Sequence, residues 1–130
     1  MQAALWSGGP ILVIEDEPSV IAFLRAALQR KGYAVENAAS GAEGIERLRE
    51  GRYAGVISDI RMPGAVNGAE VHSWIQKNRP ELASRIILIS GDTANGETQA
   101  LLAQSGTPCI EKPFRVQQLI SIVEKTFGKP

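Results

Sequence analysis

The sequence has little cysteine, no long hydrophobic run and no excess of charge of either sign, and each absence excludes a class of protein. The one cysteine, Cys109, cannot form an internal disulfide. No apolar run is long enough to cross a bilayer, and the chain start lacks the basic residues and apolar stretch of a signal peptide. Because 14 basic side chains balance 14 acidic ones and lie scattered, direct nucleic-acid binding is not indicated. We expect a soluble, cytoplasmic domain without membrane insertion.

The length sets the expected domain organisation. A chain of 130 residues suits one domain of ordinary size with a substantial core, and two domains would be crowded. The opening segment is small and contains glycine. We therefore expect residues 1–9 to be a linker or a cloning remnant and residues 10–128 to form the domain.

Four apolar runs end in charged or hydroxyl groups. The runs are residues 11–14 before Glu15, Asp16 and Glu17, residues 56–58 before Asp59, residues 86–89 before Ser90, and residues 109–111 before Lys112. Continuous aliphatic runs separated by helix-length segments are typical of buried parallel strands, whose carboxyl ends open onto one ligand-binding edge. Packing does not explain such a cluster, because unpaired charges beside a core are costly. The pattern predicts a site for a divalent cation and a phosphoryl group.

The alternation of strand and helix patterns predicts the fold. We expect strands at 11–14, 33–36, 53–58, 85–90 and 108–110, and helices from Pro18 to near Gly32, from the Ser40 N-cap to near Gly51, around 71–75, at 94–104 and at 116–127. Right-handed crossovers then give an α/β fold, a doubly wound five-stranded parallel sheet of order 2-1-3-4-5 with helices on both faces. Pro108 fits the start of an edge strand.

The motifs at the strand ends together resemble the receiver domain of two-component response regulators, from about Ile11 to Phe127. They are Val13-Ile14-Glu15-Asp16-Glu17-Pro18, Ser58-Asp59-Ile60-Arg61-Met62-Pro63-Gly64, Ile89-Ser90-Gly91 and Glu111-Lys112-Pro113-Phe114. The resemblance implies a flavodoxin-like three-layer sandwich. It also implies a phosphoacceptor domain that assists its own phosphorylation and dephosphorylation and is not otherwise an enzyme.

The resemblance implies a magnesium site. Asp16 and Asp59 would be direct ligands, the backbone carbonyl of Arg61 a third, and Glu15 a ligand through water. Magnesium takes oxygen ligands in octahedral geometry and keeps several waters, so few carboxylates suffice. Mn²⁺ is the expected substitute. Glu15 stands where the family most often has aspartate, which lengthens the reach to the metal but keeps a carboxylate.

The resemblance also implies the chemistry of the site. Asp59 would accept a phosphoryl group from a phosphohistidine on a sensor histidine kinase or a histidine phosphotransfer domain, then signal or relay it, or lose it by hydrolysis. Lys112 would pair with one phosphoryl oxygen, and Ser90 would hydrogen-bond another. The alternative is a degenerate receiver that acts only as a protein-interaction module.

Three positions are expected to tune the response. In the family, the residues at Arg61 and Asp92 border the route of attacking water, although here they could equally form a screened salt bridge. Cys109 stands where the family usually has an aromatic rotameric switch, so the signal leaves by another route or the domain relays phosphate. The loop after Met62-Pro63 is also one residue longer than the commonest form.

The parent protein and its assembly are left open by the sequence. Some features resemble the receiver at the C-terminus of hybrid sensor histidine kinases. The alternatives are a free-standing single-domain regulator and a receiver that is part of a longer regulator. Leu119, Ile122 and Val123 cannot all face inward on one narrow stripe, so part of the last helix is a hypothetical contact face for a homodimer. The single histidine, His72, lies far in sequence from the acidic residues, and we expect it to have a surface or packing role.

Overall fold

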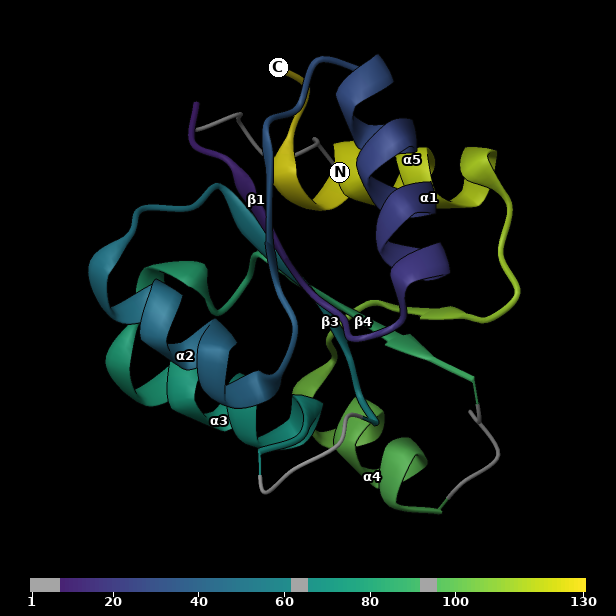
Figure 1. The fold of residues 1–130 in the computed structure, drawn as a ribbon. Coiled ribbons are helices and arrows are strands. Elements are labelled where there is room, and N and C mark those ends of the chain that lie inside the picture. The colour runs from purple at the N-terminus through teal and green to yellow at the C-terminus, as the bar shows by residue number, and fades with distance from the viewer. Residues whose placement is uncertain (1–7, 62–65, 92–95) are drawn as a thin grey trace.

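The computed structural model describes residues 8–61, 66–91 and 96–130, in which strands and helices alternate (Figure 1). The strands are β1 (Ile11–Ile14), β2 (Val35–Ala38), β3 (Gly55–Asp59), β4 (Ile86–Ser90) and β5 (Cys109–Glu111). The helices are α1 (Pro18–Arg30), α2 (Gly41–Glu50), α3 (Gly68–Asn78), α4 (Gly96–Ser105) and α5 (Val116–Phe127), with a short 3-10 helix η1 (Pro80–Leu82) after α3. All strand pairs are parallel in the order β2-β1-β3-β4-β5, which confirms the predicted doubly wound sheet.

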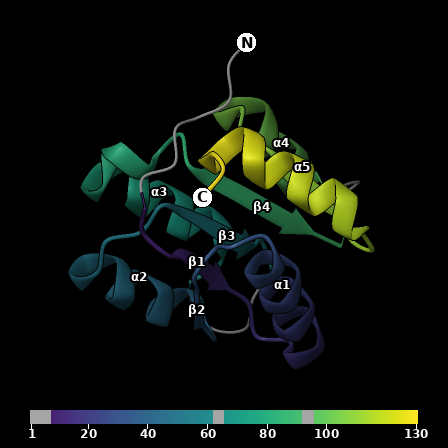
Figure 2. The ribbon, with the colours of Figure 1, turned by 90° about the horizontal axis from the view of Figure 1, so that it is seen from above.

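The sheet separates two hydrophobic cores, with α1 and α5 on one side and α2 and α3 on the other (Figure 2). Alternate residues of β1 point to opposite sides, so Ile11 and Val13 join the first core and Leu12 and Ile14 the second. Because helices cover both faces, β1, β3 and β4 are buried along their whole length. That burial is why their sequences are continuous aliphatic runs.

Local signals set the starts of three helices. Pro18 occupies the first turn of α1, where its missing N–H costs nothing. Ser40 and Asn67 cap α2 and α3, and their side-chain oxygens accept the backbone N–H groups of Glu43 and Glu70 at 3.1 and 3.0 Å. The turn from β1 to Pro18 carries Glu15 and Asp16, two polar residues of the sheet edge.

Strand β2 begins two residues later than the sequence predicts. Gly32, with φ +93°, turns the chain after α1, and the Tyr33 N–H donates to the Leu28 carbonyl at 3.2 Å. The Tyr33 hydroxyl donates to the Gly128 carbonyl at 2.5 Å. Tyr33 is therefore used to end α1 and to hold the end of α5, and pairing with β1 starts at Val35.

Other boundaries differ by one or two residues. Strands β3 and β4 begin later than predicted, β5 is shifted by one residue, and β3 extends through Asp59. The predicted start of α4 at residues 94 and 95 lies outside the described residues, as does most of the predicted linker at residues 1–9. Among the residues that are described, no helix is long and apolar enough to span a membrane.

The premise for a contact face on α5 is wrong, because its three residues do pack inward together, and the contact face itself stays a prediction. Leu119 and Val123 are fully buried, and Ile122 packs partly against the same core. The buried face is wider than one narrow stripe because α5 contacts both α1 and β4. The large apolar residue that α5 does expose is Val116, at 46%.

Candidate functional site

Four of the predicted site residues lie at the carboxyl ends of the strands. Glu15 follows β1, Asp59 ends β3, Ser90 ends β4 and Lys112 follows β5. The backbone N–H of Lys112 donates to the Ser90 carbonyl at 2.8 Å, which continues the ladder between β4 and β5 past their ends. The parallel register thus brings together residues that are far apart in the sequence.

Lys112 joins two carboxylates at this edge. Its Nζ lies 2.6 Å from Asp59 Oδ2 and 3.4 Å from Glu15 Oε2. The side chains of Glu15 and Asp59 are only 1% and 8% exposed, and that of Lys112 is 23% exposed. Two nearly buried carboxylates therefore share one ammonium group, and the site carries an excess of negative charge.

This arrangement shifts the protonation of Glu15 and Lys112. Burial, followed by the negative charge of Asp59, raises the pKa of Glu15 from 4.5 to about 7. A hydrogen bond from the Glu17 backbone and the charge of Lys112 oppose that rise in part. Burial by itself lowers the pKa of Lys112, but its hydrogen bond to Asp59 and the charges of Asp59 and Glu15 outweigh burial and raise it. The ammonium stays charged at neutral pH, where Glu15 is close to half protonated.

The Asp59 carboxylate is also held by the backbone around it. Its Oδ1 accepts the Arg61 N–H at 3.1 Å, and the Ile60 N–H donates to the Ile89 carbonyl at 2.9 Å. Gly68, the first residue of α3, packs on this turn, and a Cβ there would lie 2.5 Å from the Asp59 carbonyl oxygen and 2.6 Å from Ile60 Cα. Only glycine allows this approach. Gly68 was not among the site residues predicted from the sequence, where the one indication of it is its position directly after Asn67, the N-cap of α3.

The turn after β1 presents the other predicted metal ligands. Glu15 Oε1 accepts the backbone N–H groups of Asp16 and Glu17, each at 3.2 Å. Asp16 itself is exposed. Within the described residues, no three Asp, Glu, His or Cys side chains form a group that could hold a metal ion as they stand. The donor chemistry nevertheless fits a hard divalent cation, because Glu15 and Asp59 are oxygen donors whose joint charge one lysine does not balance.

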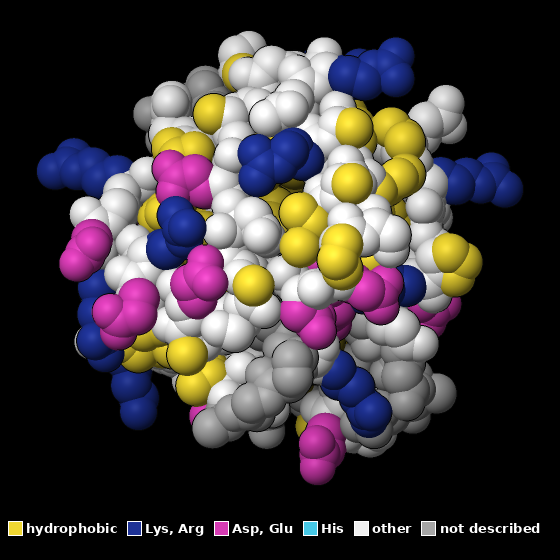
Figure 3. All heavy atoms as spheres, viewed as in Figure 1, with side chains coloured by type: hydrophobic (Ala, Val, Ile, Leu, Met, Phe, Trp, Pro, Cys, Tyr) yellow, Lys and Arg dark blue, Asp and Glu magenta, His cyan; other side chains and the backbone are white. Residues whose placement is uncertain are grey.

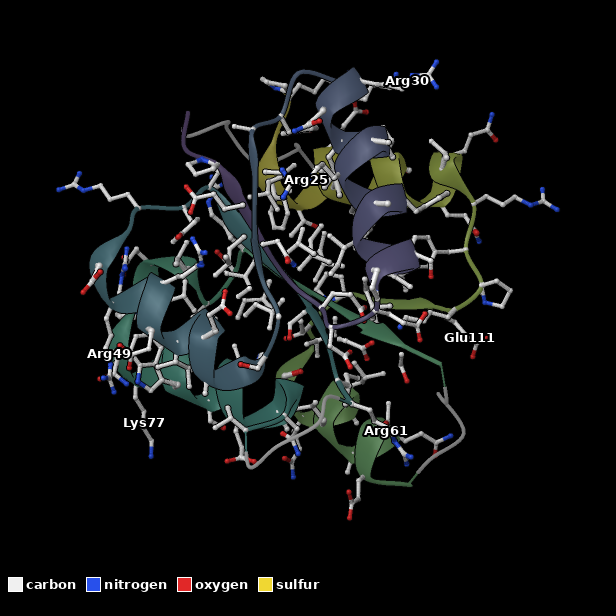
Figure 4. All side chains as sticks on the ribbon, in the orientation of Figure 1. Arg25, Arg30, Arg49, Arg61, Lys77 and Glu111 are labelled. Atoms are coloured by element: carbon white, nitrogen blue, oxygen red, sulfur yellow. The ribbon has the colours of Figure 1, made fainter. Side chains whose placement is uncertain are left out.

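The remaining predicted residues surround this centre. Ser90 is buried, at 3% exposure, and Arg61 is exposed and lies beside α4 in Figure 4. Asp92 and the Met62-Pro63 loop segment lie outside the described residues. Cys109 is half-buried, and its Sγ lies 3.9 Å from the Ile110 carbonyl oxygen. Burial, then the charges of Glu111 and Asp59, raise the pKa of its thiol.

His72 has the packing role that the sequence predicts. It is 3% exposed on α3, and its Nε2 lies 2.8 Å from Thr107 Oγ1 in the segment before β5. Burial lowers the pKa of His72, so the ring is neutral at neutral pH. His72 links α3 to β5 and stands apart from the carboxylates.

An apolar pocket of about 480 Å³, which was not predicted from the sequence, opens beside Lys112. It is lined by Ser19, Val20, Phe23, Gly91, Lys112, Pro113 and Phe114. The rings of Phe23 and Phe114 meet edge to face, with centroids 5.6 Å apart, and Phe23 is 38% exposed. Hydrophobic side chains gather over α1 on the face shown in Figure 3. The feature of the sequence that could have indicated this pocket is Phe23, an aromatic residue beside the buried stripe of α1. Helices usually carry polar residues at such a position.

Comparison with known protein families gives one clear match. The profile of the response regulator receiver domain matches residues 11–124. Among curated proteins, the response regulator receiver protein CpdR of Brucella abortus is 31% identical, over 88% of this chain and 93% of that protein. Sensor kinase CckA of the same organism is 32% identical over 92% of this chain, which amounts to 12% of the kinase. The transcriptional regulatory protein TcrA of Mycobacterium tuberculosis is 30% identical, and this chain spans 44% of it.

Solved structures give the same match. The response regulator TrrA of Thermotoga maritima, solved in complex with Mg²⁺-BeF, is 32% identical with a TM-score of 0.78, covering 91% of this chain and 98% of that one. The receiver domain of the sensor histidine kinase PA1611 of Pseudomonas aeruginosa, solved with magnesium in its active-site cleft, is 25% identical with a TM-score of 0.81. That likeness covers 95% of this chain and 100% of that domain.

Proposed function

Because the chain belongs to the response regulator receiver domain family of two-component signalling, we propose that Asp59 is its phosphoacceptor. The observation that carries the proposal is the pairing of a nearly buried Asp59 carboxylate with Lys112 at the end of β3. A carboxylate serves as a nucleophile toward phosphorus when the incoming group is held in line and its charge is neutralised. Asp59 is fixed by the Arg61 N–H on one oxygen, and Lys112 on the other is a source of the neutralising charge.

The transfer step follows from these contacts. A carboxylate oxygen of Asp59 attacks the phosphorus of a phosphohistidine and forms an acyl phosphate. The N–P bond breaks, and its electron pair returns to the imidazole. Lys112 already lies 2.6 Å from Asp59 Oδ2, and it pairs with one oxygen of the negatively charged phosphoryl group as that group approaches. The Ser90 hydroxyl donates a hydrogen bond to another phosphoryl oxygen. Later hydrolysis of the acyl phosphate restores Asp59, and Arg61 and Asp92 set the rate at which water reaches it.

The acidic edge would hold magnesium, with Mn²⁺ as a substitute. Asp16, which is exposed, Asp59 and the Arg61 carbonyl would be the direct ligands, and Glu15 would bind through water. When bound, the ion supplies positive charge that neutralises the phosphoryl oxygens. The sharing of one Lys112 ammonium by two carboxylates supports this proposal, because the protein alone does not balance their joint charge. The pKa of Glu15 is raised first by burial and then by the charge of Asp59, and the second cause points the same way.

The donor would be a histidine kinase or a histidine phosphotransfer domain that docks over the pocket beside Lys112. The pocket places Phe23 and Phe114 next to the reacting edge, so an apolar helix could bind there while its phosphohistidine reaches Asp59. Phe23 is exposed in the free domain, as a contact residue must be. Cys109 cannot act as an aromatic switch, so the output signal would leave through the segment after Ser90 and α4, or the phosphoryl group would be relayed.

Intact mass after treatment with acetyl phosphate and magnesium tests this function. The wild type should gain one phosphoryl group, Asp59→Asn should gain none, and omission of magnesium should suppress the gain. Glu17→Gln is the matched control, because it removes an exposed carboxylate from the same edge and should leave the gain unchanged. No adduct with acetyl phosphate or with a phosphohistidine donor would support the interaction-only alternative.

A further inference from the structure

We propose that Asn37 is a positioning residue that holds the turn after β1 in the geometry needed for magnesium, an inference that rests on the proposed function. Asn37 is half-buried in β2 and pairs with Val13 of β1. Its side-chain nitrogen lies 3.0 Å from the Val13 carbonyl oxygen, 3.2 Å from that of Ala38 and 3.5 Å from that of Glu15. Three acceptors thus surround one NH₂ group. The amide oxygen could not take this place, because it has no proton to donate.

The shortest contact, to the Val13 carbonyl, crosses from β2 to β1 near their carboxyl ends, and the contact to the Ala38 carbonyl lies within β2 itself. The Ala38 carbonyl also accepts the Glu15 N–H at 3.0 Å, so it is shared between the backbone of Glu15 and the side chain of Asn37. The Val13 carbonyl is held from the same nitrogen. β1 is held on its other side by β3, where Ile14 pairs with Ser58, and on this side by the edge strand β2. The Asn37 amide therefore ties the two strands together where β1 leaves the sheet.

The turn that follows carries two of the proposed metal ligands. Glu15 turns its carboxylate inward, where Oε1 accepts the Asp16 and Glu17 N–H groups. Its backbone carbonyl faces Asn37 at 3.5 Å. Glu15 is thus restrained through both its side chain and its backbone. The backbone of Glu15 sets the starting direction of Asp16, so a shift at the end of β1 moves both carboxylates relative to Asp59.

Side chains that orient metal ligands without touching the ion typically change metal affinity about 10-fold to 100-fold when they are removed. We expect the low end of that range for Asn37, because it acts on the turn through backbone carbonyls and not on a ligand side chain. Asn37→Leu keeps the branched shape of the side chain but has no donor. Asn37→Gln keeps the NH₂ group on a longer stem, so it should recover part of the affinity.

Glu36→Gln is the matched control. Glu36 is the preceding residue on β2, and its carboxylate accepts hydrogen bonds from Tyr53 and Arg47, away from the turn. Magnesium dissociation constants would be measured by calorimetry on the folded proteins. Hydrogen exchange at the Asp16 and Glu17 amides would be measured without metal. Asn37→Ala takes the place of Asn37→Leu if that variant does not fold.

The expected result is magnesium binding about tenfold weaker in Asn37→Leu, with faster exchange at Asp16 and Glu17. Glu36→Gln should match the wild type in both. Unchanged magnesium affinity in Asn37→Leu would overturn the positioning role, whatever its exchange rates, and would leave the proposed function of Asp59 standing. Weaker binding with unchanged exchange would also overturn it, because the turn would not have moved. Failure of the wild type to bind magnesium would overturn both.

Discussion

The Glu15→Gln substitution should stabilise the metal-free protein at alkaline pH. In the folded state, burial and the charge of Asp59 hold the pKa of Glu15 at about 7, compared with an ordinary value of 4.5. The folded protein therefore binds this proton more tightly than the unfolded chain does. The contribution of Glu15 to the stability of the folded protein is therefore fully present below pH 4.5, is lost as the pH rises through 7, and does not return above that.

The size of the effect follows from the same pKa. One pKa unit corresponds to about 1.4 kcal/mol, so ionising Glu15 costs the folded state up to about 3 kcal/mol. Glutamine removes that cost but gives up the charge contact with Lys112, which lies 3.4 Å from Glu15 Oε2. Its own Oε1 can still accept the Asp16 and Glu17 N–H groups. We expect a net gain of about 1–3 kcal/mol in the free energy of unfolding at pH 8.

Urea unfolding with a chelator present, at pH 8 and near pH 5, measures this difference. The gain of Glu15→Gln over the wild type should be large at pH 8 and should shrink toward zero near pH 5. Glu17→Gln removes an exposed carboxylate from the same turn and should show no comparable dependence on pH. A Glu15→Gln variant that is less stable than the wild type at pH 8, or a gain that does not vary with pH, would refute the reasoning.

Three further predictions address the metal, the fold of the site and the donor. Magnesium at about 100 times its Kd should raise the free energy of unfolding by about 2.7 kcal/mol, and Asp59→Asn should lose most of this gain in urea titrations. Gly68→Ala should destabilise by roughly 1–3 kcal/mol, since its Cβ would lie 2.5 Å from the Asp59 carbonyl oxygen, whereas Gly96→Ala, with nothing within 4 Å, should change stability by less than about 1 kcal/mol. A large loss in Gly96→Ala, or none in Gly68→Ala, would contradict this. Phe23→Ala should slow transfer from a phosphohistidine donor about tenfold, yet leave labelling by acetyl phosphate unchanged, and equal slowing of both would argue against donor docking at the pocket.

The strand order and the position of the site were predictable because the relevant signals are local. The run at residues 11–14 is aliphatic throughout because helices cover both faces of β1, and Pro18 and Ser40 mark helix starts by their own backbone chemistry. Once the order of the strands is fixed, the edge at which Glu15 and Asp59 lie follows from parallel geometry. The roles of these residues in phosphorylation stay predictions.

The parts that could not be predicted depend on contacts between distant residues. The start of β2 is set by a Tyr33 hydroxyl that reaches Gly128, and no pattern near residue 33 encodes that bond. Asn37 looks like an ordinary polar residue at the end of a strand until three carbonyl oxygens are seen around its side chain. The requirement for glycine at position 68 likewise arises from the close approach of α3 to Asp59.

Peptide mapping of the phosphorylated protein tests the central claim most directly. Borohydride reduction converts an aspartyl phosphate to homoserine, which marks the acceptor by its mass. After incubation with acetyl phosphate and magnesium, the account predicts that the mark falls at Asp59 and that Asp59→Asn carries none. A mark at Asp16 or Glu15 in the wild type, or equal marking in Asp59→Asn, would contradict the account.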